Sequence, residues 1–266
     1  VTLYPFMNVL AISLNDATDT IKNINFIIPR HFTLANYKYV FKEGGIVQPL
    51  FISIAKTVIG TLAGVICTAM LAYTLSRRDF VFHRFFTLLF VITMYVGGGM
   101  IPEYLLIVRT LHLGDNFLVY IISGLIWVYN MILVRSFIDG LPGALQEAAK
   151  LDGANDFQIW YKVVMPLCTP VIATIALYYA VGQWNSFMDT YLYAKKLPTL
   201  QYKLYEIMSQ ATMQLDTHTT TNATQAVTPM AIRMAVTVVA TVPIIIVYPF
   251  VQKYFVGGMT LGSVKD

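Results

Sequence analysis

Charged residues are scarce in this 266-residue chain. They make up 12% of the sequence, whereas 57% is hydrophobic, and a typical soluble domain carries about 25% charged residues. So few charges exclude an ordinary soluble domain and predict an integral membrane protein in contact with lipid. The net charge of +4 comes from dispersed basic residues, which form no footprint for nucleic acid, so no nucleic-acid partner is expected.

The residue types that catalysis, metal binding or disulfide formation would need are also few. The only two cysteines, Cys67 and Cys168, lie far apart in apolar surroundings and are interpreted as small packing residues. The four histidines show no ligand spacing, and no G-x-x-x-x-G-K-[ST] phosphate loop occurs. We therefore expect no catalytic residue, no metal and no cofactor on this chain, which cannot hydrolyse ATP by itself.

Long hydrophobic segments dominate what is present. A full bilayer crossing needs about 20 apolar residues, and the hydrophobic segments cover residues 1–14, 48–75, 85–108, 117–138, 163–181 and 230–249. Because the first is too short to cross alone, we expect the natural chain to begin earlier, with residues 1–14 as the second half of its first helix. The expected fold is an all-α integral membrane protein with six transmembrane helices, in a single domain over residues 1–266.

Residues 147–170 form the only long polar interruption between two hydrophobic segments that is neither a turn nor a disordered loop. Pro142 lies near a helix start, and apolar residues recur at helical spacing, so residues 142–152 are expected to form a short amphipathic helix. Gly153 is expected to end it in a left-handed conformation, and Asn155 to cap a second helix with Gln158. The pattern predicts a helical elbow against a membrane surface, between the fourth and fifth spans.

The elbow resembles the EAA loop of ABC importer permeases, whose pattern is E-A-A, three residues, G, nine residues, I, one residue, L-P. The matching positions are Glu147, Ala148, Ala149, Gly153, Val163, Met165 and Pro166. Valine replaces the isoleucine and methionine replaces the leucine. D-G-A at 152–154, W-N-x-F at 184–187 and G-S-V-K at 262–265 resemble the carbohydrate-uptake, maltose-permease-like branch, closest to its oligosaccharide and polysaccharide permeases.

This resemblance implies the function and the partners. The family's loop, here residues 142–166, is a cytoplasmic coupling helix that docks on a separate ATPase, which binds ATP and magnesium. The residues that the resemblance assigns to this docking are Glu147, Ala148, Ala149, Leu151, Asp152 and Gly153. It also implies a second homologous permease in a heterodimer, two ATPase subunits and an extracytoplasmic sugar-binding protein. The chain is then expected to be a multi-pass permease subunit of an ATP-driven carbohydrate importer in a bacterial cytoplasmic (inner) membrane, and not an enzyme.

The third hydrophobic segment contains three glycines and a proline at 97–103. Irregular backbone at membrane depth is tolerated where protein buries it or where it lines a wet cavity. Tyr95, Glu103 and Tyr104 are therefore candidates for the substrate path. An equally weighted alternative is a break close to the outer surface, with Glu103 simply solvated.

Amide side chains give further candidates for the substrate path. A buried Asn130 needs partners, and it is either a link between helices or a sugar ligand. Gln183, Trp184 and Asn185 end the fifth segment, and an aromatic ring beside amides suits sugar stacking. Tryptophan is also a common interfacial anchor, which is the favoured interpretation for Trp184 alone.

In the second segment, Gly60 and Gly64 form a small-residue face that favours close helix packing. Lys56 lies near one end of this segment, and we expect its amine to extend to the membrane interface. Residues 188–229 form the longest external segment. Its part at 203–214 is expected to be helical and to reach the binding protein, as the resemblance implies.

The sequence leaves alternatives open for the orientation of the chain in the membrane and for the class of transporter and solute. The loops on either side of the membrane carry eight Lys and Arg each, but the short loop at 76–84, with Arg77, Arg78 and Arg84, favours the elbow side as cytoplasmic. An ion-driven secondary transporter would need acidic residues within the spans, which have almost none apart from Glu103. An ABC permease for amino acids, peptides or metal is the other alternative, and the sequence does not specify which carbohydrate is carried.

Overall fold

The computed structural model describes the backbone of residues 3–16, 19–20, 27–42, 44–216 and 228–261, and the side chains of these except 210–216, 229 and 247–261. Within this part of the chain the structure is helical, with a single antiparallel bridge between Asn15 and Phe32. The all-α prediction is confirmed. The chain divides into two compact units, which are described separately.

Unit 1 comprises residues 1–54 and 185–247. Its elements are α1 (Tyr4–Ser13), α3 (Ala35–Lys42), the start of α4 (Val47–Ser76), α13 (Met188–Tyr193), α14 (Leu200–Asp216) and most of α15 (Pro229–Leu261). The buried Asn36 holds the end of α1, because its Nδ2 donates to the carbonyls of Ser13 (3.0 Å) and Asn15 (2.9 Å). Carbonyls at a helix end have no partner within the helix, so this side chain completes α1.

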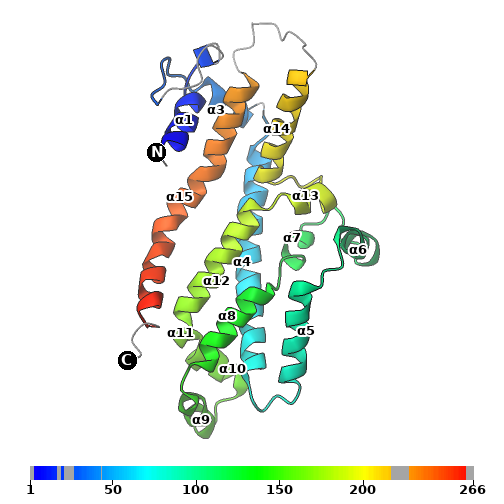
Figure 1. Cartoon of the computed structure of the whole chain (residues 1–266), viewed down its shortest axis with the longest axis vertical. Helices are drawn as coiled ribbons and strands as arrows, with labels where there is room; N and C mark the ends of the chain where they lie inside the picture. The colour runs from blue at the N-terminus through cyan, green and yellow to red at the C-terminus, as the bar shows by residue number, and fades with distance from the viewer. Residues whose placement is uncertain (1–2, 17–18, 21–26, 43, 217–227, 262–266) are drawn as a thin grey trace. The chain divides into compact units, whose positions relative to one another are not determined.

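Unit 2 comprises residues 55–184 and 248–266 and contains the predicted elbow (Figure 1). After the rest of α4, its elements are α5 (His83–Tyr95), α6 (Met100–Leu105), the π-helix η1 (Leu106–Thr110), α7 (Leu118–Ile122), α8 (Val128–Asp139), α9 (Gly143–Leu151), α10 (Asp156–Ile159), the π-helix η2 (Trp160–Val164), α11 (Met165–Leu167) and α12 (Thr169–Asn185). In Figure 1, α9 and α10 lie at the end of this unit where α4 finishes and α5 begins.

The close packing of α4 and α12 follows from the small residues of α4. A Cβ atom on Gly64 would lie 2.7 Å from Cε1 of Tyr179, and one on Gly60 would lie 2.9 Å from Cδ of Gln183. Real Cβ atoms essentially never approach other atoms so closely, so a larger residue at Gly64 would displace the Tyr179 ring, and one at Gly60 would displace the Gln183 side chain. The predicted small-residue face is confirmed.

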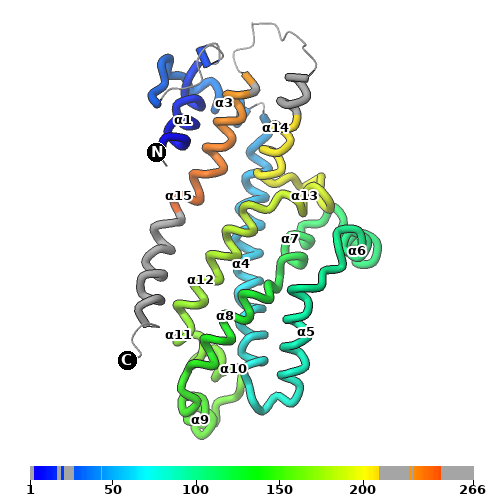
Figure 2. Tube along the Cα trace, in the orientation of Figure 1, coloured from blue at the N-terminus to red at the C-terminus, as the bar shows by residue number. Residues whose placement is uncertain are grey.

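The third hydrophobic segment is broken at the predicted glycines. The chain leaves α5 at Val96, and the pair formed by α5 and the helix at 100–110 is bent by 114°. None of the residues of α5 or α6 is buried within the chain. The expected single third span is thus two helices with a sharp turn, because residues 97–99 do not sustain helical backbone (Figure 2).

The expected continuous fourth helix is wrong. Residues 117–138 contain α7 and α8, separated by a non-helical stretch at 123–127 (Figure 2). The backbone amide of Trp127 donates to Tyr179 Oη (2.9 Å), and Tyr179 Oη donates to the carbonyl of Leu125 (3.3 Å). Nothing in the local sequence of the segment supplies these partners. A side chain from α12 satisfies the backbone groups that the break releases, which stabilises it.

The fifth segment also starts at a different place from the predicted one. Residues 163–167 belong to η2 and α11 on the elbow side, and α12 begins at Thr169 and continues to Asn185. The two helical stretches on either side of Cys168 are bent by 86°. The expected span at 163–181 therefore corresponds to α12, because the bend at Cys168 directs the preceding residues away from its axis.

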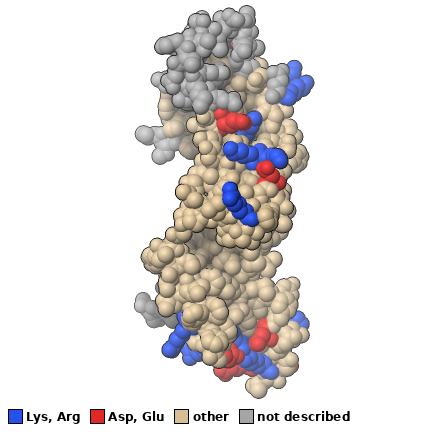
Figure 3. All heavy atoms as spheres, turned by 90° about the vertical axis from the view of Figure 1, so that its right-hand side faces the viewer, with Lys and Arg blue, Asp and Glu red and all other residues tan. Residues whose placement is uncertain are grey.

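Membrane-spanning capacity is concentrated in few elements of the described chain. By itself only α4 is long and apolar enough to cross a bilayer, and up to three spans result if each bent pair counts as one. The expected sixth span lies within α15, whose described side chains form an apolar helix at Met230–Ile246. On the face shown in Figure 3, charged side chains gather at the end of unit 2 that carries α9, next to a broad surface free of charge.

Candidate functional site

The elbow has the local geometry that its sequence predicts. Pro142 is the N-cap of α9, and Gly153 follows the helix at φ +80°. Such a backbone conformation is strained for residues with a side chain. Asn155 then starts α10 with a complete capping box. Its Oδ1 accepts from the amide of Gln158 (2.8 Å), and Gln158 Oε1 accepts from the amide of Asn155 (2.9 Å).

The predicted coupling residues form an exposed tip. Leu151 is 89% exposed, the highest exposed fraction of any large apolar side chain that the structure describes. Glu147, Ala148, Asp152 and Gly153 are also exposed. Ala149 differs, because it packs against the apolar core of unit 2. The tip therefore exposes both apolar and acidic side chains, whereas Ala149 packs α9 against the apolar core of unit 2.

An apolar core anchors the elbow to the spans. Ile159, Trp160 and Val164 are buried in one cluster with residues of α4 and α8. Among the side chains that they join are Ala69, Ala72, Leu75, Met131, Val134, Ile138, Cys168 and Ile175. Burying a large apolar side chain contributes about 1.5–3 kcal/mol, so the second half of the elbow is fixed to the body of unit 2.

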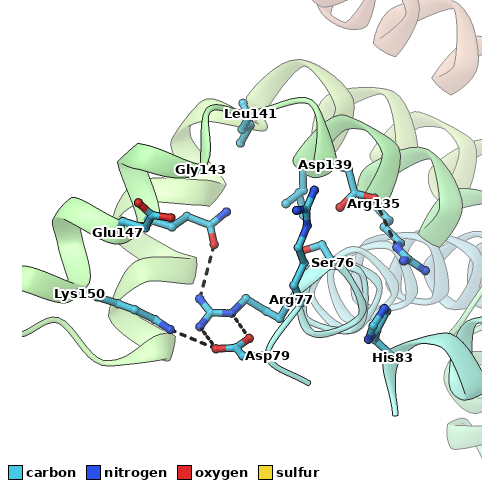
Figure 4. A pocket seen from close by; sticks show the side chains of 13 residues that line it. Ser76, Arg77, Asp79, His83, Arg135, Asp139, Leu141, Gly143, Glu147 and Lys150 are labelled. Atoms are coloured by element: carbon cyan, nitrogen blue, oxygen red, sulfur yellow. Dashed lines mark hydrogen bonds and ion pairs between the residues drawn. The ribbon is translucent and has the colours of Figure 1, made fainter. Parts of the chain in front are cut away.

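A polar network on the opposite side ties the elbow to the end of α4 (Figure 4). Arg77 directly follows α4, and its Nε and Nη2 bind both carboxylate oxygens of Asp79 at 3.0 and 2.7 Å. Nη2 also pairs with Asp156 at the start of α10 (3.1 Å), and Nη1 donates to Gln146 of α9 (3.5 Å). Lys150 of α9 binds Asp79 at 3.1 Å.

The ion pairs set the protonation of this network. The guanidinium of Arg77, and next the ammonium of Lys150, hold the pKa of the Asp79 carboxyl well below its usual range. The hydrogen bonds to Asp79 raise the pKa of Arg77 above its ordinary value. Both groups are therefore charged at neutral pH. The network borders a cavity of about 640 Å³ between the 76–83 segment, α8 and α9.

The candidate substrate-path residues fall into two sets by burial. Tyr95, at the end of α5, is 84% exposed, and Glu103 and Tyr104 lie exposed on α6. Asn185 is exposed as well. The buried set comprises Asn130 in α8 and Gln183 and Trp184 in α12. Since Trp184 is only 7% exposed, it does not fit the interpretation as an interfacial anchor.

Within the buried set, the side chain of Gln183 forms a hydrogen bond, whereas that of Asn130 forms none with the described residues. Nε2 of Gln183 donates to the carbonyl of Tyr120 at 3.3 Å. Both polar atoms of the Asn130 side chain are buried without a hydrogen-bond partner among the described residues. Neither observation assigns a sugar contact to these amides. The contact of Gln183 holds α7 against α12.

The sequence did not predict the contacts of several residues near the site. Lys56 was expected to reach the membrane interface, but it is fully buried, with Nζ 4.7 Å from the centre of the Tyr120 ring. A lysine over an aromatic face is stabilised by the ring quadrupole. Tyr179, Arg77 and Asp79 were not singled out as partners, because their contacts come from distant segments that local sequence patterns do not connect.

Two expectations bear on the ends of the chain. The predicted helix at 203–214 lies within α14 and is confirmed as helical. The G-S-V-K stretch at 262–265 lies outside the described residues.

Among the residues that are described, no three His, Cys, Asp or Glu side chains group as a metal site would require.

Comparison with known proteins identifies the fold and its family. The family described as "Binding-protein-dependent transport system inner membrane component" matches residues 58–261. The chain belongs to this family. A member of it is a membrane component of a transport system, and the resemblance to ABC importer permeases is confirmed.

Individual proteins of this kind match over more than nine-tenths of their length. The Bacillus subtilis (strain 168) polygalacturonan/rhamnogalacturonan transport system permease protein YtcP is 38% identical, over 100% of this chain and 93% of the relative. The arabinooligosaccharides transport system permease protein AraQ of Halalkalibacterium halodurans is 27% identical, over 100% and 92%. A bacterial ABC transporter that imports the acidic polysaccharide alginate contains a chain of the same fold, with a TM-score of 0.84, 30% identity, and coverage of 96% and 91%.

Proposed function

We propose that this chain is the permease subunit of an ATP-driven, binding-protein-dependent importer of a carbohydrate, an oligosaccharide or a fragment of a polysaccharide. Family members that match over more than nine-tenths of the chain are named for polygalacturonan, arabinooligosaccharides and alginate. These solutes are all glycans, and galacturonan and alginate are both polyanions. The names of these three proteins thus support a carbohydrate as the solute.

The observation that carries the coupling part of this proposal is the exposed tip of α9. A helix that exposes Glu147, Ala148 and most of the Leu151 side chain is suited to insert into a cleft of another protein. The apolar side chain would be desolvated there, and the carboxylate would contribute register and specificity more than affinity. We propose that the occupied cleft is that of the ATPase, so that the elbow transmits force from ATP binding.

The assembly that follows contains more chains than this one. The chain carries one elbow, so two ATPase subunits require two permeases, and we propose a heterodimer with a homologous permease. Six spans would then form a body with two arrangements. They are the first segment, α4, the two bent pairs, the segment that contains α7 and α8, and α15. ATP closure of the ATPases would open the path outward to a sugar-binding protein, and hydrolysis would reset it.

The test uses the complete complex reconstituted in lipid, with Glu147→Arg and Gly153→Val as the variants. The first reverses the charge at the tip, and the second forces a β-branched residue into φ +80°. We expect each to lower binding-protein-stimulated ATP hydrolysis and oligogalacturonate uptake on the order of tenfold. Both rates are measured in the same proteoliposomes.

The controls keep the features that matter. Gly153→Asn retains access to the left-handed conformation, and Glu147→Gln keeps the shape without reversing the charge, so both should keep most of the activity. If Glu147→Arg and Gly153→Val hydrolyse ATP and import sugar as the parent does, the elbow is not the coupling element. Uptake of peptides but not of oligogalacturonate or another glycan would contradict the proposed solute class.

A further inference from the structure

The contacts of Arg77 join three elements that are distant in the sequence. Its backbone directly follows the 30-residue helix α4. Its guanidinium donates to Gln146 on α9 and to Asp79 in its own loop, and it forms an ion pair with Asp156 in the first turn of α10. The side chain is only 12% exposed although its two acidic partners are more than half exposed. One cation is thus enclosed where α4 meets both helices of the elbow.

The geometry of this group favours a fixed position. A guanidinium that binds both oxygens of one carboxylate has a defined orientation, in contrast to the single contact of a lysine. The hydroxyl of Tyr73, one turn earlier in α4, accepts a further bond from Nη1 at 3.0 Å. Lys150 of α9 binds the same Asp79. The elbow is therefore held to the 76–79 segment at two points, through α9 and through α10.

Without these contacts the elbow would be joined to the spans in fewer ways. The chain itself connects α9 to α8, and α10 to α12 through η2 and α11. The apolar cluster around Trp160 secures the second half of the elbow, whereas α9 contributes only Ala149 to it at its edge. The polar network is the additional connection between the exposed tip and α4.

We propose that Arg77 is a positioning residue for coupling, which fixes α9 and α10 to the end of α4 so that α4 moves together with the elbow when the ATPase moves. This inference rests on the proposed coupling role of α9. Since α4 packs against α12 through its glycines, motion of the elbow then reaches two packed helices at once. A loss of the network leaves the ATPase site and the apolar cluster around Trp160 intact but lets α9, with the exposed tip, move without α4.

The first test measures sugar imported per ATP hydrolysed, in proteoliposomes with oligogalacturonate as the probe. Arg77→Gln should lower this ratio on the order of fivefold, the range typical of residues that transmit coupling, while the amount of assembled complex stays unchanged. Arg77→Lys should restore part of the ratio, because it keeps the charge but not the bidentate contact. Asp156→Asn removes only the contact to α10 at an exposed position and should give a smaller decrease.

Arg84→Gln is the matched control, since it removes the same charge from the same basic segment. Arg84 is exposed and makes no ion pair among the described residues, so its ratio should equal that of the parent. A general effect of charge loss on this segment would lower the ratio for Arg84→Gln as well, and that result would overturn the assignment to Arg77.

A second measurement is independent of the sugar. Spin labels at Thr74 on α4 and Ala144 on α9, with Cys67 and Cys168 replaced by alanine, report the distance between the two helices in the complete complex. The parent should give one narrow distribution, the same with and without ATP, and Arg77→Gln should broaden it or make it depend on ATP. Parent-like distributions and ratios for both Arg77→Gln and Asp156→Asn would overturn the positioning role.

The two levels of the proposal fail differently. If the unaltered complex hydrolyses no ATP in response to its binding protein, the proposed function is wrong and the role of Arg77 in coupling falls with it. If the unaltered complex couples normally and Arg77→Gln does so too, only the positioning role is wrong.

Discussion

The hydroxyl group of Tyr179 serves three other groups in the interior of unit 2. It accepts from the amide of Trp127, donates to the carbonyl of Leu125, and lies 2.7 Å from Oγ1 of Thr68 on α4. The side chain itself is fully buried. A backbone amide that loses its partner in such a place bears its full desolvation cost. At the scale of the residue, one phenol therefore makes the break between α7 and α8 possible.

Tyr179→Phe should lower the free energy of unfolding by about 1–2 kcal/mol, because the Trp127 amide loses its acceptor while the packing of the ring stays. The measurement is the thermal unfolding midpoint of the purified chain in detergent. The matched control is Tyr178→Phe, at a neighbouring and partly exposed tyrosine, which should leave the midpoint unchanged. A similar midpoint for both variants would show that the hydroxyl of Tyr179 does not stabilise the break.

At this scale, prediction from sequence succeeded where the partners are local. The left-handed Gly153 and the capping pair of Asn155 and Gln158 are confirmed, since each involves residues within one turn of the chain. Lys56 was misplaced because its partner, Tyr120, lies on a different helix. Which distant side chain a polar group meets depends on how the helices pack, and a residue pattern does not contain that information.

The contact between α4 and α12 shows how an element is placed by its smallest residues. The Tyr179 ring and the Gln183 side chain of α12 lie within 3 Å of where a Cβ atom on Gly64 or Gly60 would be, so a larger residue at either position requires one of them to move. Helices in a membrane gain no hydrophobic driving force from association, so close backbone approach supplies the packing energy instead. The position of α4 against α12 therefore depends on both glycines.

Gly64→Val should separate α4 from α12 and reduce stability by about 1–3 kcal/mol through overpacking. Its Cβ would lie within 3 Å of the Tyr179 ring. The ring must then move, and its hydroxyl loses the hydrogen bond from the Trp127 amide as well. The measurement is again the thermal midpoint in detergent, together with transport in proteoliposomes. Enlarging the exposed Val58 of the same helix to leucine is the control. Equal stability of the two variants would contradict the close-packing account.

The helices themselves were predicted unevenly. The breaks at 97–99 and at Gly153 follow from residues that disfavour helix where they stand, and both are observed. The break at 123–127 was not predicted, because Gly124 is its only strong local signal and the surrounding residues are as apolar as those of a continuous span. Its stability depends on Tyr179 and Gln183 of α12, which approach only in the folded unit.

At the scale of the whole molecule, the distribution of charge bears on the membrane. The face in Figure 3 has charged groups around the elbow end of unit 2 and an adjoining surface without charge. Such an apolar surface is compatible with lipid, and charged groups are compatible with water or a partner subunit. Together with family membership, this distribution supports an elbow that lies outside the bilayer.

The proposed topology predicts which cysteines an impermeant reagent can reach. In vesicles without the ATPase subunits, and in a background with Cys67 and Cys168 replaced by alanine, Leu151→Cys should be labelled by a membrane-impermeant maleimide only when the vesicles are inside-out. Lys196→Cys, in the expected external segment, should be labelled only in intact cells or right-side-out vesicles. Labelling of both positions from the same side would contradict the six-span arrangement and the cytoplasmic elbow. The labelled fraction is measured by mass spectrometry.

The sequence by itself determined the membrane character of the chain, its helical class, the elbow and the family, because each depends on composition or on spacings within a short segment. Only the tertiary structure decided where the fourth and fifth segments break, what the buried Lys56 contacts, and which groups surround Arg77. The physical reason is the same in each case. Buried polar groups must find partners, and in a bundle those partners stand on helices that are far apart in the chain.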